Sequence, residues 1–293
     1  MKIALQKLRT LDLVQTNKIS SPQFVSAASG LVIDGHKFHV IADDELYLAT
    51  FNFDGSLGTL TALFSGTLPA DHKERKKQKP DLESLIIFDE GLLAIPSGST
   101  TLRAKGVWLK NKCLQLVDFS QIYQHLKQKI KELNIEGCVI RKNEFILFQR
   151  GNGKNNENAL IFLDYLMVKT AITSGQPIPE KSLCEIKLFE LGSLNQVPLS
   201  FTDAVLGLNG CIWFIAAAEN SGSTYLDGEY VGAILGCIDH KNNITYKNEL
   251  DCPSKPEGLA LVLENSQFWI VTDADNSEQP AELFCGNIPT NYF

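Results

Sequence analysis

The segment Pro256-Glu257-Gly258-Leu259-Ala260-Leu261, followed by Phe268-Trp269-Ile270-Val271-Thr272-Asp273-Ala274-Asp275, contains a layout that recurs along the chain. An acidic residue and a small residue lead into an apolar strand, a turn, and a second apolar strand that ends in polar residues. The acidic residues of the four clear copies are Glu83, Glu136, Asp203 and Glu257, and a weaker copy has Ser29 in that place.

The copies start near residues 29, 83, 136, 203 and 257, which are 54, 53, 67 and 54 residues apart. A unit of this length with about four strands is the size of one β-propeller blade. The last unit lacks a fourth strand, which the β-compatible residues 3–13 can supply; this closes the ring and removes a sheet edge. The sequence therefore predicts an all-β fold, a single five-bladed propeller over residues 1–293. The long third step leaves a sixth, degenerate blade as the alternative.

One segment departs from the β pattern. Residues 120–133 carry Ile122, Leu126, Ile130 and Leu133 at helical spacing after a capping serine, which predicts one amphipathic helix outside the sheets. Residues 70–80 and 173–181 are predicted to be loops.

Composition narrows the function classes. The net charge of -7 argues against a nucleic-acid binder with a broad basic face. The longest apolar run, residues 211–218, is too short to span a membrane. The first residues are too polar for a signal peptide, and the seven cysteines form no CxxC pair, so we expect a cytoplasmic protein with reduced thiols.

Propeller topology places the start of each first strand and the end of each second strand at the same mouth of the central channel. Carboxylates that converge there repel one another unless they are protonated, paired or bound to metal. Hard oxygen donors suit Ca²⁺, with Mg²⁺ or Mn²⁺ as alternatives. The other interpretation is structural: each acid accepts hydrogen bonds from the neighbouring blade and binds nothing.

Two arginines are predicted to reach over this mouth. Arg103 and Arg150 follow second-strand ends in loops rich in Gly, Ser or Asn. They can hold an anionic substrate or neutralise acids between blades. Ser97, Asn152 and Glu219 are predicted ligand-binding residues at the same strand ends.

The hairpin at 255–275 resembles the opening hairpin of blades in phytase-like esterase propellers and in gluconolactonase-type propellers. In the lactonase relatives an acid at the strand start, with Asn and Asp from other blades, holds a catalytic Ca²⁺. The resemblance thus implies a metal site. Its ligands would be Glu257 and its equivalents Glu136 and Asp203, with Asn220 and Asp273. The Asp-Asp-Pro-Ala signature of alkaline phytases is absent, and the chain as a whole looks most like bacterial propellers of unassigned function.

The sequence thus predicts an acidic channel mouth, with Ca²⁺ as the expected metal, that binds a small molecule or an anion, and it leaves catalysis open. If the protein is an enzyme, the prediction is a metal-dependent phosphoester or lactone hydrolase with Glu83 or Asp275 as base. The alternative is a non-catalytic interaction scaffold, which predicts a mouth blocked by side chains and an apolar patch on a flat face.

Overall fold

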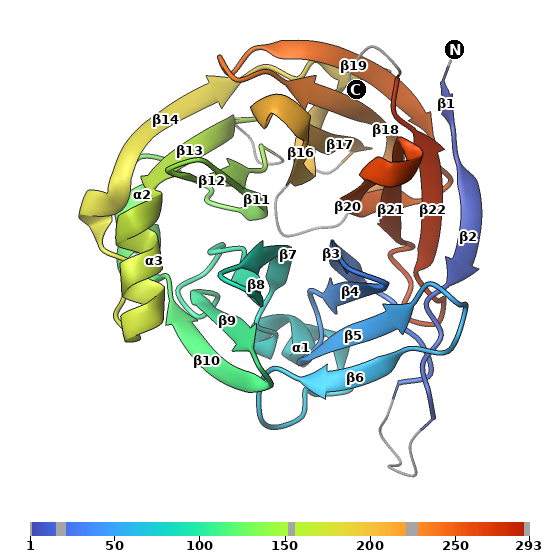
Figure 1. Ribbon diagram of the computed structural model, residues 1–293, viewed down its shortest axis with the longest axis horizontal. Coiled ribbons are helices and arrows are strands. Elements are labelled where there is room, and N and C mark those ends of the chain that lie inside the picture. The colour runs from blue at the N-terminus through green and yellow to red at the C-terminus, as the bar shows by residue number, and fades with distance from the viewer. Residues whose placement is uncertain (1, 16–21, 152–155, 221–227, 290–293) are drawn as a thin grey trace.

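Five antiparallel sheets stand around a central axis in the computed structural model, which describes residues 2–15, 22–151, 156–220 and 228–289 (Figure 1). Blade 1 consists, from the inner to the outer strand, of β3 (Ala28–Asp34), β4 (Lys37–Ala42), β5 (Tyr47–Asn52) and β6 (Thr59–Ala62). Blade 2 consists of β7 (Leu82–Phe88), β8 (Gly91–Pro96), β9 (Lys105–Lys110) and β10 (Cys113–Asp118). Blade 3 consists of β11 (Ile135–Arg141), β12 (Glu144–Gln149), β13 (Asn158–Asp164) and β14 (Leu183–Phe189). The prediction of five blades is confirmed.

The remaining two blades contain the closure of the ring. Blade 4 consists of β16 (Val197–Leu206), β17 (Ile212–Asn220), β18 (Glu229–Ile238) and β19 (Ile244–Asp251), with the short β15 (Ser193–Leu194) beside β16. Blade 5 consists of β20 (Lys255–Val262), β21 (Gln267–Asp273), β22 (Glu282–Asn287) and the N-terminal β2 (Gln6–Thr10). The N-terminal segment closes the ring as predicted, and β1 (Ile3–Ala4) also pairs with β19, so this segment holds blades 4 and 5 together.

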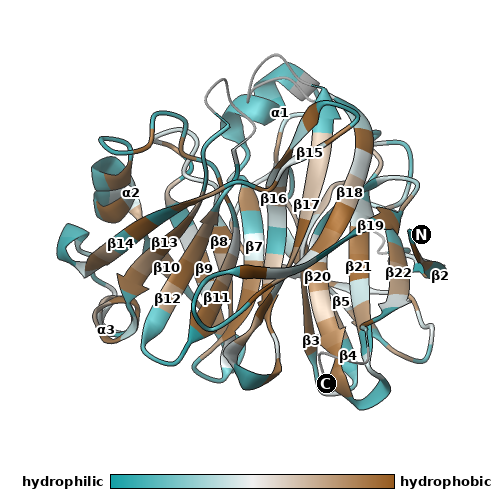
Figure 2. Ribbon diagram, turned by 90° about the horizontal axis from the view of Figure 1, so that it is seen from above, coloured by the Kyte–Doolittle hydropathy of each residue, from teal (hydrophilic) through white to brown (hydrophobic). Residues whose placement is uncertain are grey.

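Apolar side chains fill the gaps between neighbouring blades. Phe148 of blade 3 packs against Phe201 of blade 4 with ring centroids 5.1 Å apart, and Phe201 packs against Phe214 at the same distance. Four further buried clusters occupy the other gaps between blades. Figure 2 shows the result, with apolar strands in the body of the propeller and polar loops at its two faces. Burial of the apolar side chains between neighbouring blades contributes most to the stability of the ring.

The helices differ from the prediction. α2 (Ser120–Leu126) begins where expected, although its cap residue is Phe119 and not the expected Ser120. It ends seven residues early, where the chain tightens: the N–H of Lys129 bonds to the carbonyl of Leu126 three residues back. Ile130 and Leu133 are nevertheless buried. α1 (His72–Gln78) lies in the segment predicted as a loop, with Asp71 as its cap. No helix in the described residues is long and apolar enough to cross a membrane.

The long third step of the repeat comes from an insertion. α3 (Tyr165–Ser174) and the short 3₁₀ turn η1 (Glu180–Ser182) lie between β13 and β14. The side chain of Asp164 caps the start of α3, and Gly175 ends it at φ 67°. Two more 3₁₀ turns, η2 (Leu208–Gly210) and η3 (Leu263–Asn265), connect hairpin strands. The described residues form no sixth blade.

A β-bulge interrupts the pairing of the first two strands in every blade. The bulged residues are Ser29, Glu83, Glu136, Thr202 and Glu257. Directly after the bulge, inner strands of adjacent blades come very close together. A Cβ added to Gly137 would lie 3.0 Å from the backbone nitrogen of Ala204, and one added to Gly258 would lie 2.9 Å from that of Leu31. Glycine at this position therefore lets the blades close up.

Asp203 does not occupy the repeated acidic position. The bulged residue of blade 4 is Thr202, and Asp203 stands where blades 1, 3 and 5 have glycine. Its Oδ1 accepts the N–H of Ala204, and its Oδ2 accepts the N–H of Leu259 in the next blade, both at 2.8 Å. The sequence alignment of Asp203 with the three glutamates was wrong by one residue. This carboxylate has the structural role that the sequence left open as an alternative, because it accepts a hydrogen bond from the neighbouring blade and so joins blade 4 to blade 5.

The close approach predicts a position-specific cost for a methyl group. Gly137→Ala should destabilise the fold by about 1–3 kcal/mol, because the new Cβ meets backbone atoms that cannot move independently. Ser84→Ala is the matched control at the same position of blade 2, and it should change stability by less than ~0.5 kcal/mol. Urea unfolding measures both variants; equal stability of the two would contradict the steric account.

Candidate functional site

A cavity of about 660 Å³ opens at the mouth of the channel. Its lining comes from equivalent positions of several blades: bulged residues such as Glu83 and Glu136, residues two positions earlier such as Asp81 and Lys255, and residues that follow second strands. The lining carries ten carboxylates and eight cations, whereas only Ala27, Ala28 and Leu133 are apolar. The site is therefore charged on all sides and close to electrically balanced.

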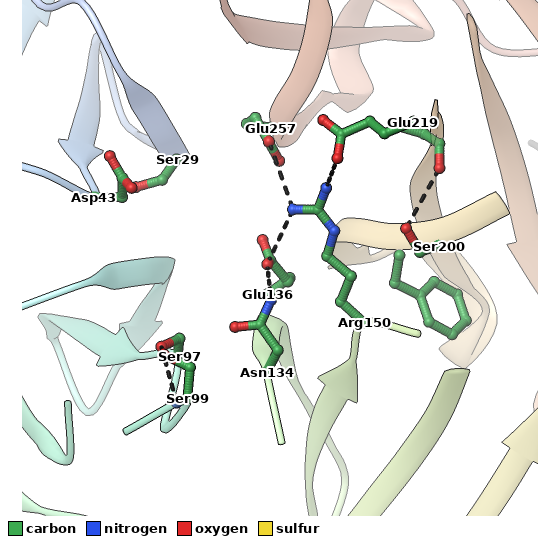
Figure 3. A network of polar contacts seen from close by, with 12 residues as sticks. Ser29, Asp43, Ser97, Ser99, Asn134, Glu136, Arg150, Ser200, Glu219 and Glu257 are labelled. Atoms are coloured by element: carbon green, nitrogen blue, oxygen red, sulfur yellow. Dashed lines mark hydrogen bonds and ion pairs between the residues drawn. The ribbon is translucent and has the colours of Figure 1, made fainter. Parts of the chain in front are cut away.

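The guanidinium of Arg150 is the centre of one charged cluster (Figure 3). It lies 3.1 Å from Oε1 of Glu136, 2.5 Å from Oε2 of Glu219 and 3.9 Å from Oε1 of Glu257. Lys255 adds a second cation, 2.9 Å from Glu219 and 2.8 Å from Glu257. Three carboxyl groups thus share two cations, and the side chains of all five residues are less than 10% exposed.

Buried charges of unequal number force a proton onto one partner. Burial raises the pKa of Glu136 to about 8 and also raises the pKa of Glu257, whereas the nearby Arg150 and Lys255 hold the pKa of Glu219 below its usual range despite its burial. Oε2 of Glu257 is buried and has no hydrogen-bond partner among the described residues. The cluster therefore has spare hydrogen-bonding capacity at the cavity.

Asp81 is the centre of the second cluster, on the side of blades 1 and 2. Its carboxylate lies 2.8 Å from Nζ of Lys79 and 2.8 Å from Nη1 of Arg103, and it also accepts the hydroxyl of Ser97. Lys79 pairs with Asp43 as well, and these two cations keep the pKa of Asp81 low. Arg103 also donates to the carbonyl of Lys76, which ties α1 to this side of the cavity.

Glu83 differs from its neighbours because its carboxyl group makes no hydrogen bond or ion pair with any residue that the structure describes. Its oxygen lies within 4.8 Å of carboxylate oxygens of Asp43 and Asp81. Burial raises its pKa well above the usual range, and the charges of Glu136 and Asp81 act in the same direction. Glu83 thus lines the cavity as an unpaired carboxyl group with a raised pKa.

The structure brings most of the predicted site residues together. Eight of the predicted site residues line the cavity: Glu83, Arg103, Glu136, Arg150, Glu219, Glu257, Asp273 and Asp275. Ser97 lies just behind, fully buried against Asp81. Asn220 ends β17 on the exposed surface outside the lining, Asp203 lies between blades, and Asn152 falls outside the described residues.

Sequence reasoning missed the cations that balance these acids. Lys255 lies two residues before Glu257 and contacts it, and Lys79 lies two residues before Asp81 and contacts it. A Lys-Pro step shortly before the acidic residues Glu83 and Glu257 was visible in the sequence. It could have shown that two of the acidic positions come with their own lysine.

The donor set as it lies does not fit a divalent metal. Among the glutamates of the first cluster, Arg150 and Lys255 occupy the position that a cation would need. In the group Asp43, Asp81 and Glu83, Lys79 already pairs with both aspartates. A metal ion would have to displace a buried ammonium or guanidinium group, so no step of the chemistry below depends on one.

Comparisons with known proteins place the chain in a family. The model of a family of unknown function (DUF6929) matches residues 24–288. The chain belongs to this family. No curated protein matches its sequence.

Several solved structures are similar to this family member. MPT-4, a mannose phosphorylase from Leishmania mexicana in complex with phosphate ion, has a TM-score of 0.50 at 10% identity, over 99% of this chain and 89% of that one. XC5397, a gluconolactonase from Xanthomonas campestris, has a TM-score of 0.46 at 8% identity, over 89% of this chain and 72% of that one. A luciferin-regenerating enzyme has a TM-score of 0.45 at 11% identity, over 90% of this chain and 77% of that one. The expected resemblance to propellers is confirmed, and its phytase-like part finds no support here.

The raised pKa of Glu136 predicts a pH-dependent stability. Its pKa is about 8 in the folded protein, whereas the ordinary value of 4.5 applies to the unfolded chain. Between pH 4.5 and pH 8 the folded state therefore binds more protons than the unfolded state, and the free energy of unfolding falls as the pH rises through that range. Urea unfolding at pH 6 and pH 8 should show this loss, and Glu136→Gln should reduce it relative to the exposed control Glu264→Gln. A wild-type protein that gains stability from pH 6 to pH 8 would contradict the assignment.

The paired glutamates predict the response to metal. We expect the melting temperature to stay unchanged when EDTA, Ca²⁺, Mg²⁺ or Mn²⁺ is added, because protein cations already neutralise the donor groups. Thermal unfolding with each ion measures this. A rise with Ca²⁺ alone would instead support the metal site that the sequence resemblance implies.

Proposed function

We propose that the cavity binds a small, hydroxyl-rich molecule and that the protein hydrolyses it with Glu83 as the proton donor. The observation that carries this proposal is the position of Glu83. It is a carboxyl group without a partner among the described residues, at a cavity whose other acids on that side are ion-paired.

The lining supports a hydroxyl-rich ligand. Its side chains are charged or polar apart from two alanines and one leucine, so an aromatic or lipid ligand would find almost no apolar wall. Protonated carboxyl groups both donate and accept hydrogen bonds, as hydroxyl groups do. The volume of about 660 Å³ lies in the range of ordinary small-molecule sites.

The acid–base role follows from two neighbouring carboxyl groups with opposite pKa shifts. Lys79 and Arg103 lower the pKa of Asp81, whereas burial raises the pKa of Glu83. Environments that separate the pKa values of adjacent acids are a frequent property of hydrolytic sites. In the proposed step water attacks a lactone carbonyl or a phosphoester phosphorus and the bond to the leaving oxygen breaks. Glu83 gives its proton to that oxygen and regains one from the attacking water.

The non-catalytic alternative expected a mouth blocked by side chains. The cavity at that mouth, with an unpaired acid in its wall, supports ligand binding instead.

Replacement of one acid tests the proposal. On a panel of sugar lactones and sugar phosphoesters at neutral pH, Glu83→Gln should lower the turnover number by about 10²–10⁴-fold, because the amide cannot release a proton. The control Glu264→Gln carries the same change at an exposed turn and should keep full activity. Full activity of Glu83→Gln on a hydrolysed substrate would overturn the acid role. Binding without turnover of any panel member would identify a binding protein instead.

A further inference from the structure

The groups of the cavity that lack partners indicate what a ligand must supply. The acids Asp43, Asp81 and Glu219 already contact protein cations. A ligand gains little from groups that are satisfied and more from those that are not. The acidic groups without a hydrogen-bond partner among the described residues include Oε2 of Glu257, Oδ1 of Asp44 and the carboxyl group of Glu83.

Two cations of the lining also remain. Lys127 and Lys131 both line the cavity, and neither ammonium group has an ion pair or a hydrogen bond within the described part of the chain. Lys127 is half-buried just after α2, and burial lowers its pKa. An unpaired, half-buried lysine is costly unless an anion joins it.

The segment that carries these lysines is firmly anchored. Ile130 and Leu133 are each 3% exposed and belong to the core between blades 2 and 3. The side chain of Gln149, 1% exposed, accepts the N–H of Asn134 and donates to the carbonyl of Glu132. Lys127 and Lys131 therefore project from a fixed wall, four residues apart.

We propose that Lys127 and Lys131 bind an anionic substituent of the substrate, a carboxylate or a phosphate, while its hydroxyl-rich part lies against Glu83. This inference rests on the proposed function and names its substrate class, an anionic sugar derivative. The two lysines are binding residues and take no part in proton transfer. Arg103 and Arg150, for which the sequence left anion binding and neutralisation of acids open, are both paired with acids of the cavity.

Calorimetric titration with three probes of one ring type tests this assignment: glucose 6-phosphate, glucuronate and glucose. For the wild-type protein we expect at least one of the two anionic sugars to bind tenfold or more tightly than neutral glucose. Which of them binds more tightly distinguishes a phosphate from a carboxylate substituent. The preference should weaken as salt is added.

The double variant Lys127→Glu/Lys131→Glu should lose this preference. Lys129→Glu is the matched control, since it reverses an exposed charge on the same segment outside the lining, and it should keep the preference. The milder Lys127→Met/Lys131→Met provides the same test if charge reversal disturbs folding, and it should also lose the preference. Equal affinity of the wild type for all three probes, binding of none, or an unchanged preference in the methionine variant would overturn the assignment.

Glu83→Gln separates this inference from the proposed function. The variant should bind the anionic probe within a few-fold of the wild type, because it retains both lysines. If Glu83→Gln stays fully active while the lysine variants lose affinity, the anion site stands and the acid role of Glu83 falls. If the lysine variants bind normally while Glu83→Gln is inactive, the reverse holds.

Discussion

The close approach of the five inner strands is the constraint on which the rest of the structure depends. Just after each bulge, the backbone of one blade comes near the backbone nitrogen of the next, with glycine at Gly30, Gly137 and Gly258. Asp203 replaces that contact with hydrogen bonds between blades 4 and 5. A bulge directly precedes each close approach. In blades 2, 3 and 5 the bulged residue is a glutamate (Glu83, Glu136 or Glu257) that lines the channel mouth.

A ring with this geometry gathers more carboxyl groups than the mouth can ionise. In each of the two clusters, centred on Arg150 and on Asp81, three acids meet two cations. Ion pairs fix most of these side chains, and burial raises the pKa of the surplus acids because it disfavours their charge. A nearly neutral cavity with acids of raised pKa is the setting that the proposed acid–base chemistry on a polar molecule requires.

The fold could be predicted from the sequence because it depends on repetition, and the details could not because they depend on register. Alternating apolar strands and a regular spacing suffice for five blades and for closure by the N-terminal segment. The sequence does not show on which residue a bulge falls, so Asp203 was aligned with the glutamates although Thr202 occupies the bulge. The same holds for the charge pairs. The acids at the mouth were predictable from topology, whereas their pairing with Lys79 and Lys255 depends on the backbone path where α1 ends and where β20 begins. α3 was missed because an insertion has no counterpart in the other repeats.

The central claim is that a bulge glutamate retains its proton in the cavity of the folded protein. The most direct test is ¹³C NMR of the glutamate carboxyl carbons during a pH titration, with the Glu83 signal assigned by its absence in Glu83→Gln. The account predicts that Glu83 is protonated at neutral pH and titrates well above the range of the exposed glutamates. A carboxyl signal for Glu83 that titrates together with exposed glutamates, near 4.5, would contradict it.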